Sequence, residues 1–266
     1  MSDRALTFQG VTRRFGKTVA VDRLNLSVEP GTVLGLVGRN GSGKTTSLRL
    51  AIGSLHADEG TIRVLGLDPS TEGIAVRSRV SLLSEESHLY PWMTVREILD
   101  FGASLHPRWD AEIAGKLERS LALEPEKKIR ELSRGTRAKV AVVLAVACRP
   151  EVLLLDDPTA GLDPLVRREV LEGVLEAVPE RGGAVIYASH LIQDTERVAD
   201  RIAVLDAGKI RLEGSLEALK RELRRVTAVF DDEPPQELDL PGAIDSRIHG
   251  RVVTVVARGD DAALES

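Results

Sequence analysis

The sequence predicts an α/β protein built on a mostly parallel sheet, and three observations lead to this prediction. Short apolar runs alternate with helical patterns through the middle of the chain, at residues 32–206. A glycine-rich turn follows the first of these runs and precedes a helical pattern. The run at 152–155 is uninterruptedly apolar, which is typical of a strand buried on both faces of a sheet. Strands that alternate with helices favour a largely parallel sheet.

The pattern of apolar residues in the first part of the chain predicts several short strands. β-like runs occupy residues 5–11, 24–29 and 32–38, with glycine and proline between them. A helix is expected from Lys44 to about Ile52, where Gly53 ends it. The run at 60–66 reads as a further strand.

Residues of about 85–150 predict a helical insertion. Thr94 and Glu97 have the spacing of a capping box. Asp110 precedes apolar residues that share one helical face, namely Ile113, Leu117 and Leu121. The single cysteine, Cys148, ends an apolar run and is expected in the core.

Strands and helices alternate again after the insertion. A buried strand at 152–155 is followed by a helix that Asp163 and Pro164 start, and strands are expected at 184–189 and in the run beginning at Arg201. We expect residues 1–214 to form one domain. Residues 215–266 are expected to form a small appendage with a short helix, an acidic proline-bearing linker or exposed loop, and one strand at 251–258.

Composition narrows the classes of function. The chain has 266 residues, a net charge of −5 and 29% charged residues of mixed sign. It lacks the basic excess expected of a protein whose main ligand is nucleic acid, so no nucleic-acid partner is expected. No apolar run approaches the ~20 residues that span a bilayer, and the first residues contain no apolar signal core. A cytoplasmic protein is expected, and any role at a membrane needs a partner.

The stretch GRNGSGKTT, residues 38–46, matches the phosphate-loop pattern G-x-x-x-x-G-K-[ST]. It lies after a predicted strand and before a predicted helix, which is the context that the pattern requires. Backbone N–H groups of such a loop wrap phosphates, Lys44 reaches the terminal phosphates of a nucleotide, and Thr45 can ligate Mg²⁺. Asp156 supplies a carboxylate for the metal. The expected nucleotide ligands here are Gly38, Asn40, Gly41, Ser42, Gly43, Lys44, Thr45 and Thr46.

The phosphate loop alone leaves kinases, small GTPases, motor ATPases and transport ATPases open. Residues 131–164, ELSRGTRAKVAVVLAVACRPEVLLLDDPTAGLDP, resemble the signature helix, Walker B strand and D-loop of the ABC-transporter ATPases. The resemblance extends over roughly residues 5–214. It implies a P-loop NTPase fold of the ABC ATPase type, with an N-terminal antiparallel β subdomain and a helical insertion. It also implies a head-to-tail dimer that holds two ATP molecules.

The resemblance assigns roles to residues outside the phosphate loop. Ser133, Arg134 and Gly135, in the signature, are expected to meet the γ-phosphate held by the partner subunit. Asp163 is expected to join the two active sites across the dimer. Both Ser133 and Asp163 also have a local reading as helix caps. His190, after the strand at 184–189, is expected to contact the γ-phosphate and hold the attacking water.

Other positions carry two readings. Phe15 corresponds to the aromatic residue that stacks on adenine, but is also an ordinary hydrophobic residue at a hairpin. Glu85 stands where the family has the Q-loop glutamine; its carboxylate can ligate Mg²⁺ but adds negative charge near the phosphates. Tyr90, Trp92 and Met93 suit an interface with a membrane partner or packing inside the helical insertion.

The acid pair departs from the family pattern. Asp156 is the expected magnesium ligand, whereas Asp157 replaces the catalytic glutamate. The shorter side chain withdraws the carboxylate by about 1.5 Å, and a misplacement of about 1 Å can cost on the order of 100-fold in rate. Either a bridging water or the backbone restores the distance, or the site binds ATP and seldom hydrolyses it. The expected catalytic residues are Asp157, His190 and Lys44.

The sequence therefore predicts an ATP-binding and ATP-hydrolysing subunit of an ABC transporter. Glu85, Arg134 and Thr136 resemble the exporter subfamily with separate membrane subunits. The expected partners are a transmembrane permease and a second ATPase subunit, identical or different, and the expected location is the inner face of the cell membrane. The alternatives are a non-transport ABC ATPase acting on DNA or ribosomes, and an ATP-binding switch with low turnover.

Overall fold

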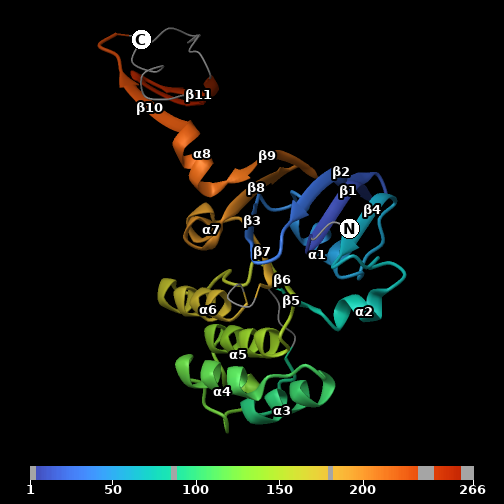
Figure 1. Cartoon of the computed structure of the whole chain (residues 1–266). Coiled ribbons are helices and arrows are strands. Elements are labelled where there is room, and N and C mark those ends of the chain that lie inside the picture. The colour runs from blue at the N-terminus through green and yellow to red at the C-terminus, as the bar shows by residue number, and fades with distance from the viewer. Residues whose placement is uncertain (1–3, 85–88, 179–181, 233–242, 259–266) are drawn as a thin grey trace. The chain divides into compact units, whose positions relative to one another are not determined.

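The computed structural model describes residues 4–84, 89–178, 182–232 and 243–258. The chain forms two compact units, Met1–Glu213 and Gly214–Ser266 (Figure 1). Within the described residues, no helix is both long and apolar enough to cross a bilayer.

A six-stranded sheet forms the centre of Met1–Glu213, with strand order β5-β6-β7-β3-β8-β9. All four strand pairs from β5 to β8 are parallel, which confirms the mostly parallel core that the sequence predicts. The strands are β3 (Val33–Val37), β5 (Val80–Ser84), β6 (Val152–Asp156), β7 (Ala184–Ser189), β8 (Arg201–Asp206) and β9 (Lys209–Ser215).

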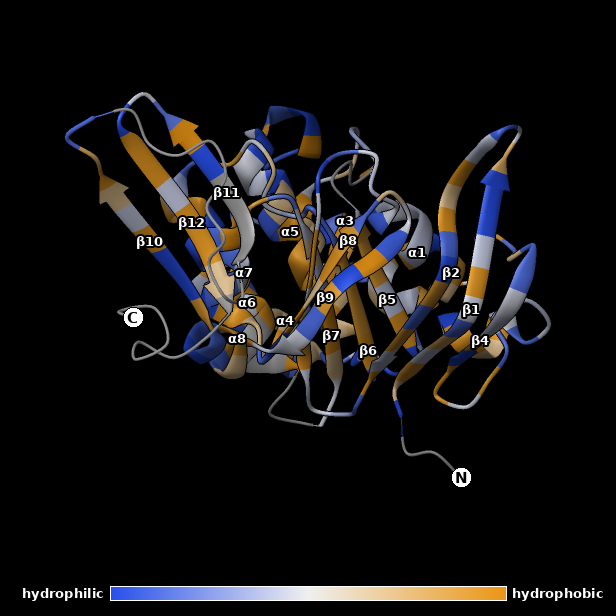
Figure 2. Cartoon of the chain, turned by 90° about the horizontal axis from the view of Figure 1, so that it is seen from above, coloured by the Kyte–Doolittle hydropathy of each residue, from blue (hydrophilic) through white to orange (hydrophobic). Residues whose placement is uncertain are grey.

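Both faces of the central sheet are buried, and β6 shows how its sequence achieves this. Leu153 and Leu155 point into a core shared with the helical insertion. Val152 and Leu154 point into a second core shared with the antiparallel strands. An uninterrupted apolar strand is thus required, and Figure 2 shows the hydrophobic colouring of these central strands.

A three-stranded antiparallel sheet of order β2-β1-β4 packs on the second core. Its strands are β1 (Leu6–Phe15), β2 (Thr18–Val28) and β4 (Glu59–Val64). The first two are longer than the sequence predicts, because β1 and β2 form one hairpin whose polar outer part stays paired from Arg13 to Thr18. The connecting helices are α1 (Lys44–Ala51), at the predicted position, and α2 (Gly73–Arg77), which the sequence did not predict.

The helical insertion consists of α3 (Val95–Leu105), α4 (Ala111–Ser120), a 3₁₀ turn (Ile129–Glu131) and α5 (Arg134–Ala147). The predicted capping box is confirmed: Thr94 Oγ1 accepts the Glu97 N–H at 3.1 Å, and Glu97 Oε2 accepts the Thr94 N–H at 2.7 Å. Asp110 caps α4 as predicted. Later helices are α6 (Pro164–Ala177) and α7 (Ile192–Val198).

The described residues of the unit Gly214–Ser266 form one helix and a second antiparallel sheet. Helix α8 (Leu216–Glu222) precedes β10 (Leu223–Val229), β11 (Ala243–His249) and β12 (Val252–Arg258), in the order β10-β12-β11. Val253, Val255 and Ala257 of the central strand form its small core. The sequence predicted α8 and β12 but missed β10 and β11. Residues 233–242 lie outside the described chain.

Candidate functional site

The phosphate loop joins β3 to α1, and its shape requires glycine at two positions. A Cβ at Gly38 would lie 2.3 Å from the carbonyl oxygen of Leu205. Gly43, which caps α1, has φ of 109°, and a Cβ there would lie 2.4 Å from the carbonyl oxygen of Ala20. Only glycine avoids both clashes, so the loop backbone can approach a ligand closely.

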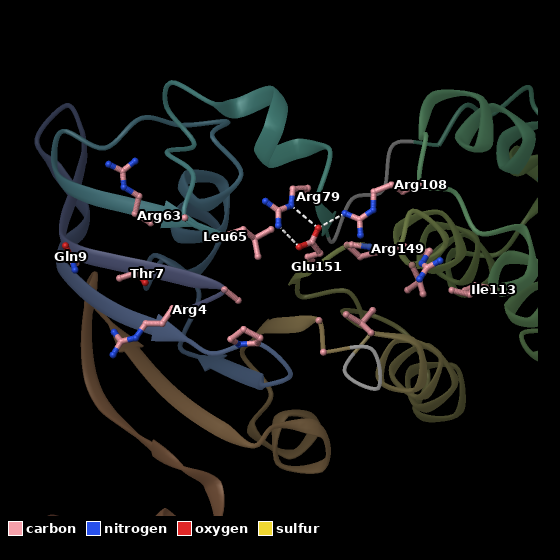
Figure 3. Close-up of a pocket in the computed structure, with 18 residues that line it drawn as sticks. Arg4, Thr7, Gln9, Arg63, Leu65, Arg79, Arg108, Ile113, Arg149 and Glu151 are labelled. Atoms are coloured by element: carbon pink, nitrogen blue, oxygen red, sulfur yellow. Dashed lines mark hydrogen bonds and ion pairs between the residues drawn. The ribbon is translucent and has the colours of Figure 1, made fainter. Parts of the chain in front are cut away.

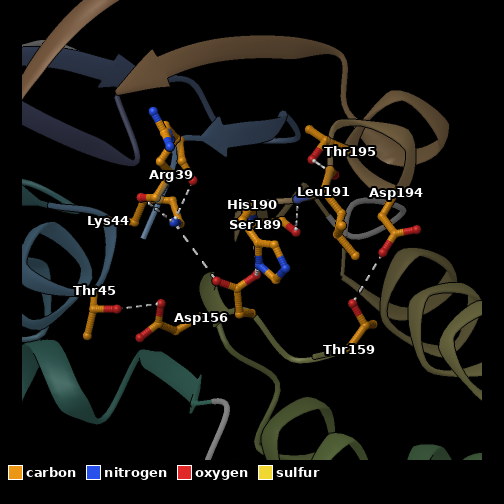
Figure 4. Close-up of polar contacts among 12 residues, drawn as sticks. Arg39, Lys44, Thr45, Asp156, Thr159, Ser189, His190, Leu191, Asp194 and Thr195 are labelled. Carbon is orange, nitrogen blue, oxygen red and sulfur yellow. Dashed lines mark hydrogen bonds and ion pairs between the residues drawn. The ribbon is translucent and has the colours of Figure 1, made fainter. Parts of the chain in front are cut away.

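Lys44 is held inside this loop. Its side chain is 5% exposed, and Nζ donates to the carbonyl oxygens of Gly38 at 2.8 Å and Arg39 at 3.4 Å (Figure 4). Nζ also lies 4.0 Å from Asp157 Oδ2. The loop thus fixes a buried cation beside the acid pair, where it can meet terminal phosphates of a nucleotide.

Thr45 and Asp156 form the second part of the site. Thr45 Oγ1 donates to Asp156 Oδ1 at 2.9 Å. Burial raises the pKa of Asp156, and the neighbouring Asp157 raises it further, although the Thr45 hydrogen bond and two cations oppose the shift. A hydroxyl and a carboxylate oxygen are ligands that Mg²⁺ accepts.

Two further observations test whether the site suits a nucleotide and its metal. Ser42 Oγ, inside the loop, is buried and has no hydrogen-bond partner among the described residues. The described residues contain no group of three or more His, Cys, Asp or Glu side chains that could hold a metal. Mg²⁺ commonly binds through one or two protein ligands plus phosphate oxygens. The residues present therefore fit a metal held jointly with a nucleotide.

Asp157 and His190 contact each other beside Lys44 of the phosphate loop. Asp157 Oδ1 accepts the backbone N–H of His190 at 3.2 Å and lies 3.0 Å from its ring Nδ1. Asp157 has φ of 45°, a left-handed conformation that Asp adopts more readily than most residues. The strained backbone is tied to β7 by a hydrogen bond from the Asp157 N–H to the Ala188 carbonyl, 2.9 Å long. In the tautomer with its proton on Nδ1, the ring Nε2 is an acceptor.

A buried polar network lies behind this pair, and the sequence analysis did not predict it. Thr159 Oγ1 lies 3.1 Å from the Tyr187 hydroxyl and 3.4 Å from Asp194 Oδ2. Arg167 Nη1 lies 3.3 Å from the same Asp194 oxygen, and Arg167 Nη2 donates to the Leu162 carbonyl at 3.2 Å. The network ties the loop after Asp157 to β7, α6 and α7. A tyrosine in an otherwise aliphatic strand was the one available signal.

Ser133 and Asp163 each cap the helix that follows them. Ser133 Oγ accepts the Thr136 N–H at 3.1 Å, and Asp163 Oδ1 accepts the N–H groups of Leu165 and Val166 at 3.1 Å. Both side chains are exposed. The contacts described for both side chains lie within α5 and α6, and nothing described joins them to the phosphate loop of their own chain.

The rest of the signature packs against the segment that precedes Asp163. A Cβ at Gly161, which has φ of 67°, would lie 2.5 Å from Arg134 Nη1. A Cβ at Gly135 would lie 3.1 Å from the Val166 side chain. The signature and the D-loop therefore form one surface at the starts of α5 and α6.

The remaining predicted ligands lie on the surface or outside the described chain. Phe15 is 46% exposed, and the Arg13 guanidinium carbon lies 4.9 Å from its ring centroid. Asn40 and Gly41 are exposed, whereas Thr46 is partly buried. Glu85 lies outside the described residues.

Comparison with known proteins agrees with this arrangement. A family model described as ABC transporter matches residues 21–160. The daunorubicin resistance ATP-binding protein DrrA3 of Streptomyces coeruleorubidus is 38% identical over 84% of this chain and 72% of its own. The Nod factor export ATP-binding protein I of Burkholderia orbicola is 35% identical over 82% and 73%. A solved ATP-binding subunit of an ABC transporter is 25% identical, with a TM-score of 0.75 over 82% of this chain and 92% of that one. The chain therefore belongs to the ABC transporter family, as one of its ATP-binding and ATP-hydrolysing proteins.

Proposed function

We propose that this chain powers an exporter by binding and hydrolysing Mg²⁺–ATP, and that it drives a separate transmembrane subunit. The observation that supports the proposal most strongly is the meeting of Lys44, Thr45, the acid pair and His190 at one edge of the parallel sheet. Ligands bind at this carboxyl-terminal edge in open α/β sheets. The alternative of a protein that acts on DNA finds no support in the charge of the chain.

In this proposal, Asp156 and Asp157 have different roles. Thr45 and Asp156 would hold Mg²⁺, which would offset charge on the phosphates. Lys44 and the loop N–H groups bind the phosphates and orient the terminal one. Asp157 and His190 face the attacking water. Asp157 fixes the ring through Nδ1, and either its carboxylate or the ring Nε2 is placed to orient the water and accept its proton.

The chain works as a head-to-tail dimer in this proposal, with an identical or a different ATPase subunit. Ser133 and Arg134 lie exposed at the start of α5, where N–H groups at a helix N-terminus favour an anion. Since the contacts described for the Ser133 side chain lie within its own helix, a second subunit is the natural source of the phosphate it meets. Closure of the dimer around ATP and its opening after hydrolysis would move the membrane subunit.

The surface that we assign to the membrane partner is an aromatic cluster on the helical insertion. Tyr90, Trp92 and Phe101 are 42%, 64% and 37% exposed. The Tyr90 ring centroid lies 5.1 Å from that of Trp92 and 5.7 Å from that of Phe101. Exposed aromatic clusters are enriched in protein interfaces. Attachment there would place the chain on the inner face of the cell membrane, and the export ATP-binding protein among its relatives supports the direction of transport.

Transport in membrane vesicles tests the proposal. The chain is expressed together with the polytopic membrane protein that co-purifies with it, and inverted vesicles are prepared. We expect ATP-dependent accumulation of the substrate in the wild type and none with Lys44→Ala. Trp92→Ala should weaken co-purification while leaving ATP binding by the isolated chain unchanged. ATP hydrolysis without any membrane partner, together with DNA-stimulated turnover, would contradict an exporter.

A further inference from the structure

A cavity lies at the opposite end of the central sheet from the phosphate loop. It has a volume of about 940 Å³. Its lining includes the residues that immediately precede β5, β6 and β7, which are Arg79, Glu151 and Gly183. The cavity is therefore separate from the nucleotide site, which lies at the other ends of the same strands.

Arginine dominates the charge of this cavity, which we call the arginine pocket. Among the described residues, its lining contains one acidic residue, Glu151, and the following five arginines (Figure 3): Arg4, Arg63, Arg79, Arg108 and Arg149. The chain as a whole carries a net charge of −5. Because the chain as a whole is acidic, we look for the groups beside these arginines that balance their positive charge.

Glu151 orders two of these arginines. Arg79 donates to it through Nε at 2.8 Å and through Nη2 at 2.5 Å, and Arg108 donates through Nη1 at 2.5 Å. Hydrogen bonds from Arg79 and Arg108 hold the pKa of Glu151 at about 2, so its carboxylate is ionised. One negative charge faces two guanidinium groups, and a positive charge is left over. Ordering of the two side chains reduces the entropy lost when a ligand binds.

The neighbouring acids balance the remaining arginines only in part. Arg149 Nη1 lies 3.7 Å from Asp110 Oδ2, which is too far for a hydrogen bond. The other oxygen of Asp110 accepts backbone N–H groups at the start of α4. Arg63 lies 3.2 Å from Asp68. Neither aspartate is among the described residues that line the pocket, and the single charge of Glu151 cannot balance the five arginines there.

We propose that the arginine pocket binds a small soluble anion that carries phosphate groups and is no larger than a nucleotide. Guanidinium groups donate paired hydrogen bonds that match phosphate oxygens. The volume lies within the range of small-molecule sites, about 300–1,000 Å³. Arg79 precedes β5, Arg108 lies between α3 and α4, and Arg149 follows α5. A bound anion would thereby link the helical insertion to the central sheet.

Calorimetric titration with inorganic pyrophosphate tests the proposal in a Lys44→Ala background, which weakens binding at the phosphate loop. We expect pyrophosphate to bind, and Arg108→Gln and Arg149→Gln each to weaken binding by about tenfold through loss of charged hydrogen bonds. Arg168→Gln is the matched control, because Arg168 is exposed on α6, pairs with Glu172 at 2.6 Å and lies outside the pocket.

The result does not depend on hydrolysis or on a membrane partner, so it is separate from the test of the proposed function. Unchanged affinity in both pocket variants would overturn the proposal, as would the absence of binding at millimolar pyrophosphate. The hydrogen bonds described for the Glu151 side chain come from Arg79 and Arg108, and the ion pair described for Arg149 is with Asp110, so Arg149→Gln remains a valid test if loss of Arg108 disturbs folding. Thermal unfolding of each variant establishes that it is folded.

Discussion

The two ends of β6 place an acid in opposite surroundings. Glu151, just before the strand, has its pKa lowered to about 2 by hydrogen bonds from Arg79 and Arg108. Asp156, the last residue of the strand, has its pKa raised by burial and by the adjacent Asp157. At the amino-terminal end, two arginines, Arg79 and Arg108, face the single negative charge of Glu151. At the carboxyl-terminal end it leaves negative charge that a bound cation would balance.

The opposite pKa shifts of Glu151 and Asp156 distinguish a carboxylate that stabilises the fold from one that serves the nucleotide site. A carboxylate whose pKa is lowered stabilises the folded chain, whereas one whose pKa is raised makes the folded chain less stable when it ionises. Removing the charge at the two ends of β6 should therefore have opposite effects on the chain without ligands.

The largest expected effect is on activity at the carboxyl-terminal end. Lys44→Ala should lower ATP hydrolysis by on the order of 100-fold or more, because it removes a buried cation from the phosphate site. Steady-state phosphate release measures the effect. Lys127→Ala is the control, since Lys127 is an exposed lysine paired with Glu124. Equal loss of activity in both variants would mean that Lys44 has no special role.

At the amino-terminal end, Glu151→Gln should lower the free energy of unfolding by about 1–2 kcal/mol at pH 7, allowing for solvent screening of these partly exposed side chains. The pKa of Glu151 is about 2 in the folded chain against an ordinary 4.5. Its contribution is therefore complete above pH 4.5 and is lost as the pH falls towards 2. Denaturant unfolding of the wild type and Glu151→Gln across this pH range should show that the difference between their free energies of unfolding shrinks as the pH falls. A difference that stays constant would contradict the lowered pKa of Glu151.

Asp156→Asn should raise the free energy of unfolding of the ligand-free chain, by on the order of 1 kcal/mol, because it removes an incompletely balanced buried charge. The asparagine oxygen can still accept the Thr45 hydrogen bond. The same variant should lose the stabilisation that Mg²⁺–ATP gives the wild type. Thermal unfolding with and without Mg²⁺–ATP measures both effects, and destabilisation of the ligand-free variant would break the contrast between the two ends.

The smallest expected effect concerns the network behind Asp157. Tyr187→Phe removes one hydroxyl and should cost about 0.5–1 kcal/mol in stability, since Thr159 keeps its contact with Asp194. A double-mutant cycle with Thr159→Val measures whether the two hydroxyl groups are coupled. Additive costs would show that the 3.1 Å contact contributes nothing.

The sequence predicted those parts of the site where the local backbone conformation allows only certain residue types. Gly38 and Gly43 are required by close contacts, and Asp163 with Pro164 marks a helix start. The pairing of Arg167 with Asp194 was not predictable, because it depends on how α6 and α7 pack. The arginine pocket was missed for the same reason, since its residues come from separate segments. Strands β10 and β11 were missed because pairing with β12, and not a strong local pattern, defines them.

The most direct measurement compares steady-state ATP hydrolysis of the wild type, Asp157→Asn and Asp157→Glu. Asp157 contacts His190 at 3.0 Å and lies 4.0 Å from Lys44, and we assign it to the attacking water. We expect the wild type to turn over ATP, Asp157→Asn to lower the rate by about 100-fold or more, and Asp157→Glu to retain activity. A wild type as inactive as Asp157→Asn, beside an active Asp157→Glu, would contradict this expectation and indicate a site that holds ATP without hydrolysing it.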